Sequence, residues 1–103
     1  MATITAVIVE ADGTARKTQI EGTLGAFQAV VGGYIEGIFR PDFTVYVNEE
    51  GIMMRLPQNE RIGEVVDYPY PLFGNALIVG PADPDGDDTD VPAHIISHYE
   101  LEQ

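Results

Sequence analysis

Three glutamates in the middle of the chain are the residues whose type and spacing most suggest chemistry. Glu36 lies in one strand-like run, and Glu49 and Glu50 lie in the turn after the next run. If the two runs pair, the three carboxylates come together, and neighbouring carboxylates can divide the roles of general acid and general base. The alternative is that Glu49 and Glu50 are solvated turn residues and that Glu36 lies on the polar face of its strand. We favour this alternative, because catalytic carboxylates need a buried setting.

Two histidines could in principle hold a metal ion. His94 and His98 are four residues apart, so a helix would carry both on one face. The residues around them, Ile95, Ile96 and Tyr99, would form the apolar side of the same helix. We therefore expect the histidines on its flank or exposed, and we assign no metal ligand to them.

An acidic segment near the C-terminus resembles the start of a calcium-binding loop, which places acidic side chains at alternate positions. The pattern breaks where Asp88 replaces the required glycine and His94 replaces the required bidentate glutamate. We interpret the segment as a solvated loop of high mobility, and we predict no cofactor. Its acidic residues are Asp83, Asp85, Asp87, Asp88 and Asp90.

Two other active-site patterns are excluded by their surroundings. Gly32 and Gly33 follow a helix-like run, whereas phosphate-binding loops place their glycines after a strand, at a helix N-terminus. Ser97, the only serine, lies in the same predicted helix as both histidines, so the sharp turn of a serine nucleophile is absent. We assign no catalytic residue and predict that the protein is not an enzyme.

The charge balance limits the class of partner. The formal net charge is -12, from 17 acidic residues against 5 lysines and arginines, and residues 62–103 contain no lysine or arginine. Direct nucleic acid binding is not expected, because affinity for the phosphate backbone depends on these bases. No apolar run approaches the roughly 18 residues of a spanning helix, and cysteine is absent. We expect a cytoplasmic protein without a membrane segment.

Two helices are predicted from apolar spacing and capping residues. The first covers residues 24–31, with Thr23 as its N-cap and a stop at Gly32. The second follows Asp90, which is expected to cap it. The apolar stripe of the first helix contains Leu24, Phe27 and Val31.

Runs rich in β-branched and aromatic residues predict the strands. Asp12-Gly13 supplies a hairpin turn, and residues 48–51 supply a second turn that would make a hairpin of residues 43–56. The result is an α+β fold, a mainly antiparallel sheet of about five to six strands with one central and one C-terminal helix. The strand-like runs are residues 4–9, 15–20, 34–39, 43–47 and 52–56, and residues 72–79 contain a turn followed by a sixth strand.

The length predicts one domain with three parts. Residues 1–80 form the α+β core, residues 81–90 the acidic loop, and residues 91–103 a C-terminal helix that packs on the core. The core of so short a chain is thin. A homodimer is expected, because a second subunit would bury more apolar surface.

Four motifs follow one another along the chain: Val31-Gly32-Gly33-Tyr34-Ile35-Glu36, Val47-Asn48-Glu49-Glu50-Gly51, Leu56-Pro57-Gln58-Asn59 and Ala76-Leu77-Ile78-Val79-Gly80. Their residues and their order resemble the family called domain of unknown function 3846, and the resemblance covers residues 4–80. Members are typically found in bacteriophages, plasmids and their actinobacterial or firmicute hosts, so the resemblance implies an accessory protein of a mobile element.

The resemblance implies no catalytic residue, so its motif positions serve as candidate binding residues. We expect a non-catalytic protein that binds a host protein or sequesters a small-molecule ligand. One alternative is an acidic nucleic-acid mimic that inhibits a DNA- or RNA-binding host protein. A small metal-dependent enzyme is the least favoured alternative. The candidate binding residues are Gly32, Gly33, Tyr34, Glu36, Asn48, Glu49, Glu50, Gly51, Pro57 and Asn59.

Overall fold

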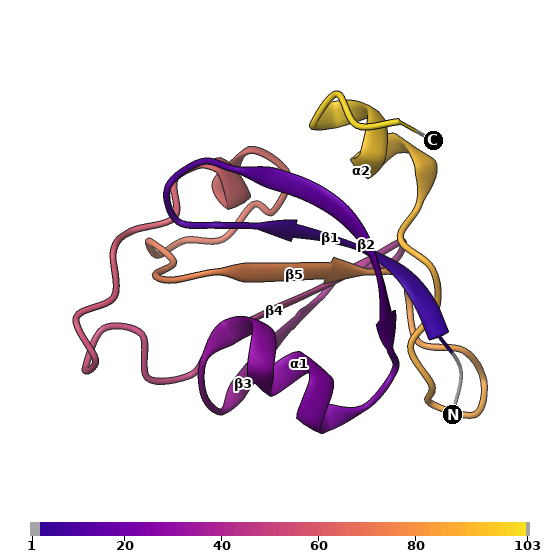
Figure 1. The fold of residues 1–103 in the computed structure, drawn as a ribbon, viewed down its shortest axis with the longest axis horizontal. Coiled ribbons are helices and arrows are strands. Elements are labelled where there is room, and N and C mark those ends of the chain that lie inside the picture. The colour runs from indigo at the N-terminus through magenta and orange to yellow at the C-terminus, as the bar shows by residue number, and fades with distance from the viewer. Residues whose placement is uncertain (1–2, 103) are drawn as a thin grey trace.

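In the part of the chain that the structure describes, five antiparallel strands form one sheet in the order β2-β1-β5-β4-β3 (Figure 1). The computed structural model describes residues 3–102. The fold class predicted from the sequence is confirmed. The strands are β1 (Thr3–Val9), β2 (Ala15–Glu21), β3 (Ile35–Phe39), β4 (Thr44–Asn48) and β5 (Ala76–Val79), and the helices are α1 (Leu24–Val31), the 3-10 helix η1 (Arg61–Glu64) and α2 (Ala93–His98).

The β1–β2 hairpin turns at the predicted Asp-Gly pair. The Asp12 carboxylate accepts a hydrogen bond from the Thr14 N–H at 2.9 Å, and Gly13 has a φ of 98°. The same hydrogen bond holds the pKa of Asp12 below its usual value. Glycine is favoured here because an L side chain rarely adopts a positive φ.

Helix α1 begins and ends where the sequence predicts. The Thr23 hydroxyl accepts from the Ala26 N–H at 3.2 Å, and Gly32 ends the helix with a φ of 81°. Phe27 and Val31 are buried, as expected. Leu24 is 58% exposed, so its assignment to the buried stripe is wrong. Phe27 joins the core between α1 and the sheet, and the partly buried Ala26 and Val30 pack against this core.

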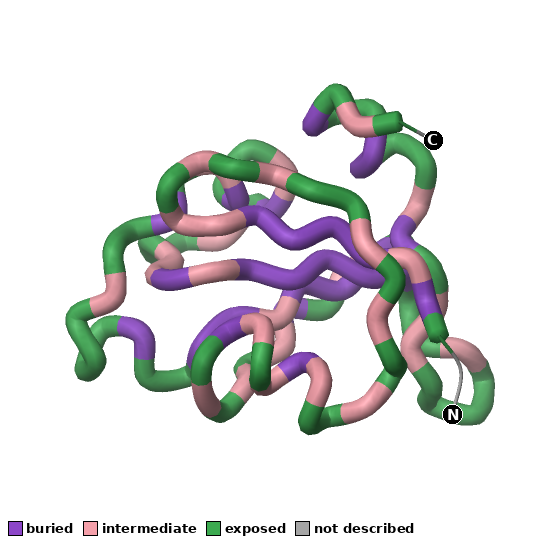
Figure 2. Tube along the Cα trace, in the orientation of Figure 1, coloured by how far each residue is buried: buried purple, intermediate pink, exposed green. Residues whose placement is uncertain are grey.

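The two faces of the sheet are covered by different kinds of structure (Figures 1 and 2). Helix α1 covers one face through Phe27, which packs with alternate residues of β1 and β5. On the opposite face, Ile62 of η1 and Ile95 of α2 join the residues of opposite alternation. Successive side chains of a strand point to opposite faces of the sheet, so the strands contribute to two separate cores.

The predicted strand at residues 52–56 is wrong. Residues 49–55 form consecutive turns, in which the Met54 N–H donates to the Glu50 carbonyl at 2.8 Å and the Leu56 N–H donates to the Gly51 carbonyl at 3.0 Å. The reason is long-range pairing: β4 already has β3 on one side and β5 on the other. No edge of β4 remains for a returning strand, so this segment becomes an exposed loop.

The acidic loop at residues 81–90 is anchored by hydrogen bonds. The Asp83 carboxylate accepts from the N–H groups of Asp85 and Asp87, both at 2.9 Å, and the Tyr46 hydroxyl donates to Asp88 at 2.8 Å. The interpretation of this segment as a solvated loop of high mobility did not anticipate these contacts. They are made by backbone turns and by a tyrosine distant in the sequence.

Asp90 does not cap α2, contrary to the prediction. Its carboxylate accepts from the Thr5 N–H at 2.8 Å, and Pro92 occupies the N-cap position without a side-chain hydrogen bond. The apolar side of α2 is buried through Ile95, Ile96 and Tyr99, as expected. None of the helices in residues 3–102 is long and apolar enough to cross a membrane.

Candidate binding groove

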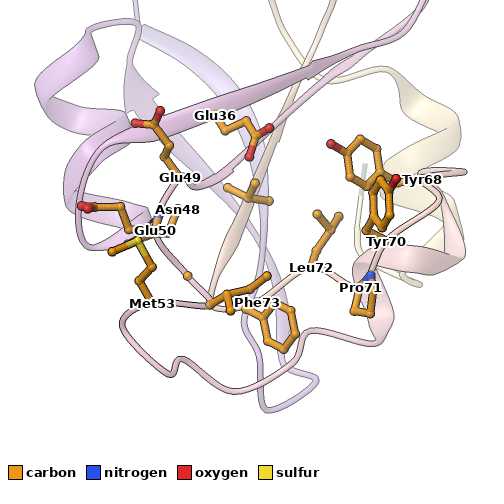
Figure 3. Close-up of a pocket in the computed structure, with 13 residues that line it drawn as sticks. Glu36, Asn48, Glu49, Glu50, Met53, Tyr68, Tyr70, Pro71, Leu72 and Phe73 are labelled. Carbon is orange, nitrogen blue, oxygen red and sulfur yellow. Dashed lines mark hydrogen bonds between the residues drawn. The ribbon is translucent and has the colours of Figure 1, made fainter.

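A groove of about 440 Å³ opens on the η1 and α2 face, beside the ends of β3 and β4. Three structures line it: the cross-strand pair Glu36 and Val47, residues 48–53 of the exposed loop, and residues 68 and 70–73. We call this site the loop groove. In Figure 3, Glu36 extends toward it from β3, Tyr68 and Tyr70 lie on the opposite side, and Glu49 and Glu50 lie on the loop side.

The sheet wall of the groove exists because the cover of this face is incomplete. Ile38 and Val45, the next pair along β3 and β4, are buried in the core under η1 and α2. Glu36 and Val47 continue the same face, but Glu36 is exposed and lines the groove. A polar residue at this position leaves the end of the face open, since a carboxylate favours water over burial.

The loop wall is fixed by Asn48, which is only 5% exposed. Its side-chain amide donates to the Val31 carbonyl at 3.1 Å, and its side-chain oxygen accepts from the Glu50 N–H at 2.7 Å. A Cβ at Gly33 would lie 3.0 Å from the Asn48 amide nitrogen, so glycine permits this approach. The loop is thereby tied to the end of α1.

Gly51 connects the loop to the opposite wall. It is buried, and a Cβ at this position would lie 3.0 Å from the Phe73 carbonyl oxygen and 3.1 Å from the Phe73 Cβ. Both distances are shorter than an ordinary van der Waals contact of 3.4–4 Å. Glycine at position 51 therefore sets how closely the two walls approach at the base of the groove.

Asn59 holds the opposite wall without lining the loop groove. Its side-chain amide donates to the carbonyls of Val9 at 2.8 Å and Gly74 at 2.9 Å, and its side-chain oxygen accepts from the Ile62 N–H at 3.1 Å. Pro57 accepts from the Gly74 N–H through its carbonyl at 2.7 Å. These two candidate residues are structural supports for the segment that carries Leu72 and Phe73.

The remaining candidates lie at the end of α1. Gly32 is the helix C-cap, and Tyr34, 65% exposed, lines a separate shallow hollow with Gly33 and Glu50. The ten candidate positions therefore lie in the loop groove, in this second hollow and in the supports of their walls, and Asn59 also lines a third hollow beside η1. Five of them line the loop groove: Glu36, Asn48, Glu49, Glu50 and Gly51.

Large apolar side chains are exposed around the groove. Ile52 is 72% exposed, Met53 80%, and Tyr70 70%. Methionine adapts its shape to different partners, and exposed apolar clusters commonly mark binding surfaces. The sequence analysis placed Ile52 and Met53 in a strand and assigned no structure or function to Tyr68 and Tyr70. The repeat Tyr68-Pro69-Tyr70-Pro71 is the signal that could have drawn attention to this wall.

The glutamates are arranged around the groove and not buried inside it. Glu36, Glu49 and Glu50 are all exposed, and the description of Glu49 and Glu50 as solvated turn residues is confirmed. An exposed carboxylate suits recognition of a positive charge at the groove mouth. None of the three carboxylates has the buried setting that is usual for catalytic carboxylates.

The two histidines of α2 have separate acidic partners. The His94 Nε2 lies 2.6 Å from Asp42, and the His98 Nε2 lies 2.9 Å from Glu64. Both histidines are exposed, in agreement with their predicted position on the helix flank. Within residues 3–102, no group of three or more histidine, aspartate or glutamate side chains is arranged to hold a metal ion.

Comparison with known proteins identifies the family. A family model described as Domain of unknown function (DUF3846) matches residues 4–102. The chain belongs to the DUF3846 family. The match extends beyond the residues 4–80 indicated by the sequence motifs, so the DUF3846 domain also includes the acidic loop and α2. No curated protein and no solved structure matches the chain.

Both walls of the loop groove therefore lie inside the DUF3846 domain. The matched residues include the β3–β4 pair, the exposed loop and the tyrosine segment. In this chain the groove depends on the complete fold of the domain, because its walls come from segments that meet only in the folded protein.

Proposed function

We propose that this protein is a non-catalytic binding protein whose loop groove receives an apolar segment of a protein partner that also carries a basic residue. The observation that supports the proposal is the composition of the groove. It combines exposed apolar side chains with three glutamates on its sheet and loop walls.

The apolar part of the site would supply most of the affinity. Burying one large apolar side chain contributes about 1.5–3 kcal/mol. Ile52, Met53 and Tyr70 are each at least 70% exposed, so a partner could bury most of their surface. Few hydrogen bonds would be lost in the process, because these side chains are almost entirely apolar.

The charged part of the site would select a basic partner. Glu36, Glu49 and Glu50 line the groove, and the whole chain has a formal net charge of -12. Such a field accelerates the encounter with positive groups and disfavours acidic ones. Tyr68 and Tyr70 are 6.2 Å apart between ring centroids and offer aromatic faces to a lysine or arginine side chain.

Selection from a displayed library of random peptides of about ten residues tests this proposal. We expect the purified chain to enrich peptides that combine apolar residues with a lysine or arginine. Met53→Ser and Glu36→Gln should each weaken binding of a selected peptide by about tenfold, or 1.4 kcal/mol.

Two matched controls separate the groove from the general surface. Leu24→Ser changes a similarly exposed apolar residue on α1, and Glu21→Gln neutralises an exposed glutamate on β2. Both controls should bind like the unchanged protein. Equal losses in Met53→Ser and Leu24→Ser, or no enriched peptide, would contradict the proposal.

A second candidate, an acidic nucleic-acid mimic, is favoured by one observation. The carboxylates of Asp83, Asp88 and Asp90 are each held by hydrogen bonds, so the acidic loop presents charges in fixed positions. A mimic would bind its partner with a steep dependence on salt, and Asp85→Asn with Asp87→Asn would reduce that slope. Groove binding would be affected far more by Met53→Ser.

A further inference from the structure

The outer edge of β3 is a free sheet edge next to the loop groove. Strand β3 is the last strand in the sheet order and pairs with β4 on one side. It contributes Glu36 to the groove, so anything added along this edge would lie beside the groove.

Hydrogen bonds at the two ends of the β3–β4 ladder show which backbone groups face outward. The Glu49 N–H donates to the Tyr34 carbonyl, and the Arg40 N–H donates to the Phe43 carbonyl, both at 2.9 Å. Because antiparallel pairing alternates, Glu36 and Ile38 direct their backbone groups to β4. Ile35, Gly37 and Phe39 direct theirs outward.

In two of these three outward residues, both the N–H and the carbonyl group are unpaired. The Phe39 carbonyl accepts from the Arg40 side chain at 3.1 Å. Among residues 3–102, the outward N–H and C=O groups of Ile35 and Gly37 have no hydrogen-bond partner. Their spacing along β3 allows these groups to form backbone hydrogen bonds with an added strand.

The opposite edge of the sheet, strand β2, is protected against pairing with another strand. Strand β2 carries the exposed bases Arg16 and Lys17, which are typical protections against edge pairing. Strand β3 contains no lysine, arginine or proline between Ile35 and Phe39. Of the two sheet edges, the one beside the groove is the less protected.

The side chains of an added strand would meet two different surfaces. On the α1 face, Phe39 folds back over Gly37, since a Cβ at Gly37 would lie 2.7 Å from the Phe39 ring. On the groove face, the new neighbour would lie beside Glu36, with Cβ atoms about 4.5–5.5 Å apart. A basic residue there would pair with the Glu36 carboxylate.

We propose that the partner binds as an extended segment added to the edge of β3, with a basic residue beside Glu36 and an apolar residue in the loop groove. This inference rests on the proposed function and specifies the conformation of the partner. Backbone hydrogen bonds to Ile35 and Gly37 fix its register, and the groove selects its side chains.

A basic peptide fits this edge better than a second copy of the chain. If the β3 strands of two copies paired antiparallel with Gly37 at the centre, Glu36 of each copy would lie opposite Ile38 of the other. No lysine or arginine of β3 would then lie beside either glutamate. Each copy also has a formal net charge of -12, which opposes association. A basic segment removes both penalties.

Hydrogen exchange measured by NMR on the full chain, with and without a library-selected peptide, tests the inference. In the free protein, the amides of Ile35 and Gly37 should exchange fast and those of Glu36 and Ile38 slowly. On binding, exchange at Ile35 and Gly37 should slow by about tenfold or more. N-methylation of alternate peptide residues should weaken binding by about tenfold for each pair of hydrogen bonds lost.

The outcomes distinguish this inference from the proposed function. Resonance shifts at Met53 and Phe73 without protection of Ile35 and Gly37 would overturn strand addition while supporting groove binding. Protection that depends on protein concentration in the absence of peptide would identify a second copy as the occupant and would also overturn it. If no peptide binds, both proposals are wrong.

Discussion

The two faces of the sheet are covered in different ways, and the loop groove opens on the face without α1. On one face a single capped helix, α1, completes a core with residues of β1 and β5. The other face is covered jointly by the 3-10 helix η1, the short C-terminal helix α2 and irregular segments. A regular helix presents one continuous stripe, whereas several short segments leave gaps between them. The loop groove is such a gap, at the end of β3 and β4.

The contrast separates residues that stabilise the fold from residues available for binding. Irregular segments can present side chains to solvent on a rigid sheet, which is why binding residues concentrate on such segments. The α1 face would then tolerate surface changes with little effect on binding. The groove face would tolerate changes of exposed residues with little effect on stability.

The largest expected effect comes from breaking the helical face. Phe27 is 3% exposed and stacks on Tyr46, with ring centroids 5.1 Å apart. Phe27→Ala should lower the free energy of unfolding by about 3–5 kcal/mol, because it removes a buried ring and leaves a cavity. Chemical denaturation measures the change. Leu24→Ala in the same helix should cost less than about 0.5 kcal/mol, and a similar loss in both variants would contradict the assigned helix face.

A smaller effect is expected when the supports of the groove face are removed. Asn59→Ala should cost about 2–4 kcal/mol, because two buried carbonyls and one buried N–H lose their partner. Asn48→Ala should cost about 1–2 kcal/mol and should abolish peptide binding, since it releases the groove loop from α1. Denaturation and peptide titration of both variants check the difference. If Asn48→Ala binds peptide normally, the loop is not held by this side chain.

The smallest expected effect is a loss of stability at high pH. Burial raises the pKa of Tyr99 from 10.0 to about 12, and its hydroxyl donates to the Arg61 carbonyl at 2.8 Å. The unfolded chain releases this proton first, so the contribution is complete below pH 10 and is lost as pH rises through about 12. Stability should fall by about 1–2 kcal/mol over this window. Tyr99→Phe should show a shallower decline, and an unchanged profile would exclude Tyr99 as its cause.

Local patterns in the sequence determined much of the fold and part of the candidate site. The Asp-Gly turn, the Thr23 cap, the Gly32 stop and five of the six predicted strands depend on neighbouring residues. These features form through contacts within a few positions, so spacing and residue type are sufficient to predict them. The turn at residues 48–51 was predicted for the same reason, through Asn48 and Gly51, whereas its choice as a candidate binding surface came from the resemblance to the DUF3846 family.

Only the tertiary structure decided which strands are neighbours and therefore where the groove lies. Residues 52–56 have a strand-like composition, but β5, some thirty positions along the chain from β4, occupies the place beside it. Asn59 became a buried support through hydrogen bonds to Val9 and Gly74. Such contacts join residues distant in sequence, and their energy depends on the packing of the whole sheet. No local pattern encodes them, so the exposed apolar wall became visible only in the folded protein.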